Sequence, residues 1–125
     1  MKRVLVLDDE PDIVAVIMLI LTDAGYNAEG IGTGAELFNK VERFKPDLII
    51  LDVMLGEYDG RKLCVALKSA SHTKHIPILM ISASHDLLSM KENYCMPDAF
   101  LDKPFDIYEL AAKVKNLLDI NDGYL

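Results

Sequence analysis

Apolar residues gather in five short runs along the chain, each bounded by polar or turn-forming residues. The first, third and fourth runs are apolar at every position, which is typical of strands buried on both faces of a parallel sheet. The second run contains Glu29 and Gly30 and therefore predicts a strand at the edge of the sheet. The runs lie at 4–7, 27–31, 48–51, 78–81 and 98–101.

Between these runs, apolar residues recur three or four positions apart, which indicates helices. Pro11 suits the first turn of the first helix, and Gly25 suits its C-terminal cap. Thr33 is a candidate N-cap for the second helix. The fourth segment has the weakest pattern and predicts only a short helix. The expected helices lie at 11–24, 35–44, 61–68, 85–96 and 105–118.

The alternation of five strands with five helices predicts the α/β class: a doubly wound, five-stranded parallel sheet covered on both faces, with right-handed crossovers. An edge position for the second strand fits the flavodoxin-like strand order 2-1-3-4-5. In this order the first and third strands are neighbours, and the topological switch point lies between their carboxyl ends.

Length and charge narrow the function classes. A chain of 125 residues is expected to form one domain at 1–120, followed by a flexible polar end at 121–125. The net charge of -7 argues against direct binding to nucleic acid or to an anionic membrane.

No apolar run approaches transmembrane or signal-peptide length, so we expect a cytoplasmic protein. Cys64 and Cys95 lack metal-ligand spacing, and we expect two reduced thiols.

Chemically active side chains follow four of the five predicted strands. Asp8 and Asp9 follow the first strand, Asp52 the third, Ser82 the fourth and Lys103 the fifth. Each residue alone has an ordinary explanation, such as capping a helix or lying on the surface. Because the carboxyl ends of parallel strands meet at one edge of the sheet, we expect these side chains to converge there.

Three converging carboxylates repel one another unless a cation lies among them. Oxygen ligands of this kind suit Mg2+, which usually keeps waters and a phosphate oxygen in its shell. With Mg2+ present, a carboxylate such as Asp52 can act as a nucleophile toward a phosphoryl group. Lys103 would supply positive charge to the phosphoryl oxygens, and Ser82 a hydroxyl donor.

Four segments resemble the receiver (CheY-like) domain of two-component response regulators. They are VLVLDDEPD, LIILDVMLGEYDG, PILMISA and FLDKPF, and the resemblance covers essentially the whole chain. It implies a phosphorylation-activated switch in phosphorelay signal transduction, which catalyses only its own phosphorylation and dephosphorylation and is otherwise not an enzyme. The phosphoryl donor would be a sensor histidine kinase or a histidine phosphotransfer protein.

The resemblance also assigns roles to individual residues. Asp52 would be the phosphoacceptor, Lys103 the phosphate-binding lysine, and Asp8, Asp9 and Asp52 would hold Mg2+ with the backbone carbonyl of Met54. Ser82 and Phe100 would be the switch pair that changes the surface made by the fourth helix, fifth strand and fifth helix. The bond before Pro104 would be cis. A phosphorylation-dependent dimer is left open.

The chain departs from the family pattern at two places. Gly56 stands where the family usually has Pro, which predicts a less stiff loop. Met96-Pro97 replaces a usual Gly-Ala pair and leaves the shape of the fourth-helix surface open. No member of the active-site set is missing, so a degenerate receiver acting only by protein contact ranks below a working one.

Two other classes use related folds. A phosphatase of the haloacid dehalogenase type needs a second acid two residues after its nucleophilic Asp, and this chain has Met54 there. A flavin or nucleotide binder needs a phosphate-cradling loop after the first strand, where Asp8, Asp9 and Glu10 would repel a phosphate. The sequence does not identify the kinase, the output, or a longer parent protein.

Overall fold

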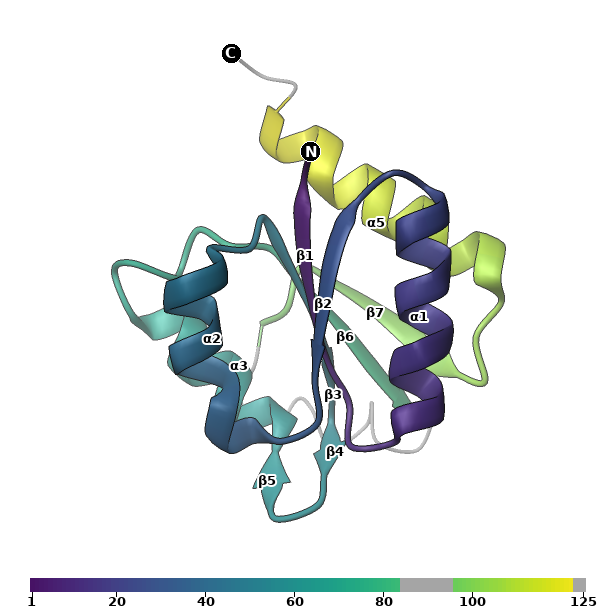
Figure 1. Cartoon of the computed structure of the whole chain (residues 1–125). Coiled ribbons are helices and arrows are strands. Elements are labelled where there is room, and N and C mark those ends of the chain that lie inside the picture. Colours follow the sequence, from purple (N-terminus) through teal and green to yellow (C-terminus); the bar gives the residue numbers. More distant parts are fainter. Residues whose placement is uncertain (84–95, 123–125) are drawn as a thin grey trace.

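The described residues, 1–83 and 96–122 of a computed structural model, form an α/β fold whose strands lie side by side between two layers of helices (Figure 1). Residues 85–95 of the predicted helix at 85–96 lie outside the described residues. The elements are β1 Arg3–Leu7, α1 Pro11–Asp23, β2 Asn27–Ile31, the 3-10 turn η1 Gly34–Glu36, α2 Leu37–Phe44, β3 Leu48–Asp52, β4 Met54–Leu55, β5 Tyr58–Asp59, α3 Gly60–Ser69, β6 Ile78–Ala83, β7 Ala99–Lys103 and α5 Ile107–Asp122.

The main sheet has the strand order β2-β1-β3-β6-β7, with every pair parallel. The predicted fourth and fifth strands are β6 and β7, so the order 2-1-3-4-5 and the edge position of β2 are confirmed. Strand β3 lies at the centre, and all five of its residues are buried. Helices cover both faces of the sheet at this strand, which explains why its sequence is apolar on both faces.

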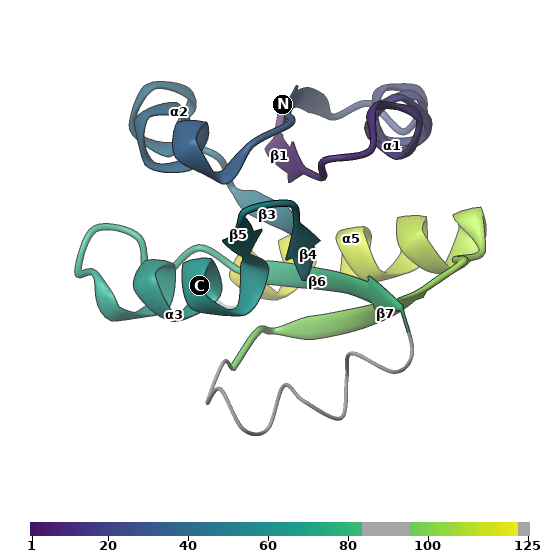
Figure 2. The same ribbon diagram turned by 90° about the horizontal axis from the view of Figure 1, so that it is seen from below.

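Alternate residues of the strands point to opposite faces and build two separate cores. On one face Leu5 and Ile49 pack with the apolar sides of α2 and α3. On the other face Val6 and Ile50 pack with α1 and α5. Both views show the same division, with α2 and α3 on one side of the sheet and α1 and α5 on the other (Figure 2).

The segment after β3, which the sequence predicted to be a loop, is a two-stranded hairpin made by β4 and β5. Gly56 and Glu57 form its two-residue turn, and Gly56 has φ +63°. A left-handed residue at the first turn position suits hairpin geometry, because the turn then follows the twist of the strands. Gly56 therefore permits a tight turn where Pro could not adopt this φ.

Cys64 corrects the expectation of reduced thiols, because it is disulfide-bonded in the structure. Cys95 lies outside the described residues. Sequence spacing alone does not reveal whether two cysteines approach in the fold, which is why the expectation failed. In the described part of the chain, no helix is both long enough and apolar enough to cross a membrane.

Candidate functional site

The predicted site residues come together at the carboxyl edge of the sheet. Leu7 pairs with Leu51, so Asp8 and Asp52 follow neighbouring positions on β1 and β3. Ser82 on β6 and Lys103 on β7 lie at the same end of their strands, one register step apart. The edge is the lower one in Figure 1, where the β4-β5 hairpin projects.

Lys103 links the two buried carboxylates of this edge. Its ammonium lies 3.0 Å from Oδ2 of Asp8 and 3.2 Å from Oδ2 of Asp52, to which it donates a hydrogen bond. Burial of the ammonium opposes its charge, but the close contact with Asp8 and the negative charges of Asp52 and Asp8 outweigh burial and raise the pKa of Lys103. Lys103 therefore stays protonated and serves as the internal counter-ion.

Asp52 is only 4% exposed, and its carboxyl group is hard to ionise. Burial, followed by the charge of Asp8, raises the pKa of Asp52 from 3.8 to about 6, against the opposing effects of Lys103 and the backbone N–H of Met54. The single positive charge of Lys103 does not fully balance the negative charges of Asp8 and Asp52. The arrangement therefore favours additional positive charge beside Asp52.

The carboxylates of Asp8, Asp9 and Glu10 form a second feature of this edge. One oxygen of each lies within 4.8 Å of the others, and Asp8 is buried whereas Asp9 and Glu10 are exposed. Oδ1 of Asp8 also accepts a hydrogen bond of 2.9 Å from the backbone N–H of Glu10, which shapes the loop. These hard oxygen donors fit Mg2+.

The predicted metal ligands are Asp8, Asp9, Asp52 and the backbone carbonyl of Met54, and this assignment stays a prediction. Within the described residues, Asp8 and Asp9 belong to a tight carboxylate group that also contains Glu10. Asp52 is paired with Lys103. Sequence reasoning noted the acidic run but did not single out Glu10 as a candidate ligand. Three consecutive acids at the end of a strand were the signal that could have indicated it.

Ser82 and Phe100 differ in their surroundings. Ser82 is fully buried, and its hydroxyl has no hydrogen-bond partner in the described structure. Phe100 pairs in register with Met80, yet its side chain is 37% exposed. A buried, unsatisfied hydroxyl is unusual and marks a group that is available to a new acceptor. The Lys103-Pro104 bond is cis, as expected.

The start of α3 lies against the strand that carries Asp52. The backbone N–H of Gly60 donates to the carbonyl of Val53 at 2.7 Å, and a Cβ on Gly60 would lie 2.0 Å from the Asp52 carbonyl oxygen. Asp59 caps the helix by accepting from the backbone N–H of Arg61 at 2.9 Å. Its carboxylate also accepts two hydrogen bonds from the Arg61 guanidinium. Only glycine at position 60 permits this close packing.

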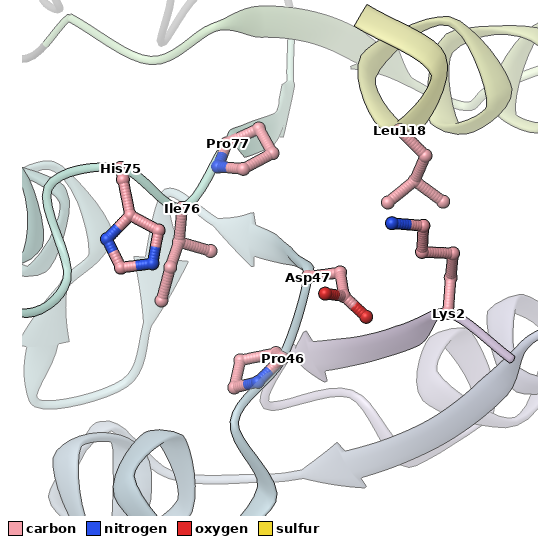
Figure 3. Close-up of a pocket in the computed structure, with 7 residues that line it drawn as sticks. All are labelled: Lys2, Pro46, Asp47, His75, Ile76, Pro77 and Leu118. Atoms are coloured by element: carbon pink, nitrogen blue, oxygen red, sulfur yellow. The ribbon is translucent and has the colours of Figure 1, made fainter. Parts of the chain in front are cut away.

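A hollow of about 350 Å³ lies at the opposite, amino-terminal end of the strands (Figure 3). It is bordered by Asp47 before β3, Pro77 before β6 and Leu118 of α5. None of the predicted site residues lines it. The strand-end residues therefore form a site separate from this hollow.

The family model of the response regulator receiver domain matches residues 4–115. The alkaline phosphatase synthesis transcriptional regulatory protein PhoP of Bacillus subtilis is 36% identical over 121 residues, which cover 94% of this chain and 48% of PhoP. The DNA-binding dual master transcriptional regulator RpaA of Synechocystis is 34% identical over 123 residues, covering 98% of this chain and 51% of RpaA. The chain thus spans about half the length of these relatives.

Solved structures agree with the sequence relatives. The signal receiver domain of a signal transduction histidine kinase from Syntrophus aciditrophicus has a TM-score of 0.86 at 31% identity, covering 95% of this chain and 91% of that chain. The chemotaxis response regulator CheY4 of Vibrio cholerae has a TM-score of 0.82 at 28% identity, covering 94% of this chain and 98% of CheY4. The chain therefore belongs to the response regulator receiver domain family, whose members are phosphorylation-activated signalling switches.

Proposed function

We propose that this chain accepts a phosphoryl group on Asp52 and that Lys103 holds that group. The observation that carries the proposal is the placement of a buried, incompletely compensated carboxylate next to a partly buried ammonium, 3.2 Å away, at the end of the central strand. A phosphoryl group on Asp52 would bring its oxygens to Lys103, which is a strong donor to phosphate.

The transfer is a displacement at phosphorus. A carboxylate oxygen of Asp52 attacks the phosphorus atom of a phosphohistidine, and the new O–P bond forms as the P–N bond to the imidazole breaks. The imidazole leaves with the electron pair of that bond and takes up a proton. Lys103 stabilises the phosphoryl oxygens throughout and donates no proton to the reaction.

Asp8, Asp9 and Glu10 are proposed to hold Mg2+ at this edge, together with Asp52 and the carbonyl of Met54. The cluster of carboxylate oxygens within 4.8 Å supports the first three ligands. When bound, Mg2+ neutralises charge on the phosphoryl oxygens and on these carboxylates. The fold itself keeps the ammonium of Lys103 beside the carboxylate of Asp52, at 3.2 Å.

The response to phosphorylation is proposed to pass through Ser82 and Phe100. The unpartnered hydroxyl of Ser82 would hydrogen-bond a phosphoryl oxygen, and a hydrogen bond to a charged group contributes about 1.5–3 kcal/mol. Movement of Ser82 would vacate space into which the partly exposed ring of Phe100 can turn. The surface around β7 would then differ between the two states.

The proposed donor is a sensor histidine kinase or a histidine phosphotransfer protein. PhoP and RpaA are named as transcriptional regulators, and the part of their length that this chain does not span leaves the downstream partner open. A phosphorylation-dependent dimer through the changed surface is compatible with the proposed switch.

Intact-protein mass spectrometry after incubation with acetyl phosphate and Mg2+ tests this function. Wild type is expected to gain one phosphoryl group, and Asp52→Asn none. Asp119→Asn, at an exposed position of α5, is the matched control and should be labelled like wild type. Labelling of Asp52→Asn at the wild-type level would refute the assignment, and sustained release of phosphate at enzymic rates would favour a phosphatase.

Ser82→Ala tests the proposed response separately from phosphorylation. The variant should still be labelled on Asp52, but its β7 amide chemical shifts should change much less than those of wild type when a phosphate mimic is added. Shifts as large as in wild type would show that Ser82 has no part in the switch.

A further inference from the structure

The β4-β5 hairpin carries Met54, whose backbone N–H stabilises the ionised Asp52 carboxylate. Its base is held at β3, because Gly60 packs on the Asp52 carbonyl and bonds to Val53. Its turn lies beside the acidic cluster, since a Cβ on Gly56 would lie 3.8 Å from Oδ2 of Asp9. The orientation of the hairpin therefore sets where its backbone lies relative to Asp52 and Asp9.

Tyr58 is the side chain through which the hairpin touches the connection between β2 and α2. Leu55 and Tyr58 are directly paired across the hairpin, so their side chains lie on the same face. Leu55 is buried in the core cluster on the α2 and α3 face. Tyr58 points to the same side, and 37% of this residue remains exposed.

The contact with Gly34 is close. A Cβ built on Gly34 would lie 2.7 Å from Cγ of Tyr58 and 3.0 Å from both Cβ and Cδ1. Gly34 is buried and begins the turn η1, which Thr33 caps by accepting from the backbone N–H of Ala35 at 3.3 Å. The ring of Tyr58 thus rests on a backbone position that has no room for a side chain.

We propose that Tyr58 is a positioning residue: by packing on Gly34 it fixes the orientation of the β4-β5 hairpin, and thereby the placement of the Met54 backbone beside Asp52 and of the turn beside Asp9. This inference rests on the proposed function of the Asp52 site. In this proposal Tyr58 acts through the hairpin and not on the reacting groups themselves. The β2-α2 connection becomes part of the support of the site.

The contact allows a test that adds and then removes a steric clash. Gly34→Ala adds a methyl group against the ring, Tyr58→Ala removes the ring, and the double variant has the methyl without the ring. Tyr58→Phe keeps the ring and serves as the conservative rescue. Gly32→Ala is the matched control, because a Cβ on Gly32 meets nothing within 4 Å and its φ is not left-handed.

Mg2+ affinity is measured by calorimetric titration at a temperature where every variant is folded, and the initial rate of Asp52 phosphorylation is measured with acetyl phosphate. Tyr58→Ala and Gly34→Ala should each weaken Mg2+ binding about threefold to tenfold and slow phosphorylation similarly. Tyr58→Phe and Gly32→Ala should match wild type. In the Tyr58→Ala background, Gly34→Ala should have no further effect, because the clash is gone.

Amide chemical shifts of Met54 and Asp9 in the metal-free protein give a readout that needs neither Mg2+ nor phosphorylation. These amide shifts should differ from those of wild type in Gly34→Ala and should match those of wild type in Gly32→Ala. If Tyr58→Ala loses stability but keeps wild-type Mg2+ affinity, rate and amide shifts, or if the two substitutions act additively, the inference is overturned. If wild type itself is not phosphorylated on Asp52, the proposed function fails, while the amide shifts still decide the role of Tyr58.

Discussion

Asp52→Asn should stabilise the metal-free protein at neutral pH, although it removes the proposed phosphoacceptor. The buried carboxylate is more costly to ionise in the folded chain than in the unfolded chain, since burial and the charge of Asp8 raise its pKa from 3.8 to about 6. Asparagine has nearly the same shape and carries no charge. The substitution therefore removes a charge that the fold tolerates poorly.

The size of the effect follows from the pKa. A rise from 3.8 to about 6 corresponds to about 3 kcal/mol in the free energy of unfolding. The folded state binds the proton more tightly than the unfolded state, so wild type loses stability as pH rises from about 4 to about 6. The advantage of Asp52→Asn should be near zero below pH 3.8 and complete above pH 6.

Urea denaturation of both proteins across this pH range, with a chelator present, measures the difference. The free energies of unfolding of wild type and Asp52→Asn should converge at low pH and differ by about 3 kcal/mol at pH 7 to 8. Saturating Mg2+ should narrow the gap, because it binds the folded wild type more tightly. A difference that does not depend on pH, or an Asn variant that is less stable at neutral pH, would refute the raised pKa of Asp52.

Three further variants test the packing of the site. Gly60→Ala places a methyl group 2.0 Å from the Asp52 carbonyl oxygen and should cost about 1–3 kcal/mol or more in urea denaturation; an unchanged midpoint would contradict the contact. Ser82→Ala removes an unpartnered hydroxyl and should leave the unphosphorylated protein at least as stable in thermal melts, whereas a clear loss would show that the hydroxyl is bonded. Asp59→Ala should cost about 1 kcal/mol near pH 7, and hydrogen bonding to Arg61 lowers the pKa of Asp59, so this loss should disappear as pH falls through that lowered pKa.

The strand order could be predicted because the polarity of each apolar run depends on where its strand lies in the sheet. Leu48 to Leu51 are apolar at every position since β3 is covered on both faces, and Glu29 is tolerated in β2 because that strand is at the edge. Once the order is known, the convergence of Asp8, Asp52 and Lys103 follows from the parallel direction of the strands. These inferences need only local pattern and topology.

Other features depend on distances that no local pattern encodes. The β4-β5 hairpin requires the left-handed φ of Gly56, and the contact of Tyr58 with Gly34 joins segments that are distant in the sequence. The raised pKa of Asp52 reflects burial by the completed fold. The disulfide bond of Cys64 likewise depends on spatial proximity, which explains why the expectation of reduced thiols was wrong.

The ion pair of Lys103 with Asp8 joins the last strand of the sheet to the first. During synthesis, the ribosome releases β1 and β3 before β7, so an incomplete chain carries Asp8 and Asp52 without their shared counter-ion. A truncated product ending before Ala99 would likewise contain the proposed acceptor but lack its cation. The charge balance at this edge of the sheet is therefore complete only once β7 has joined β1 and β3.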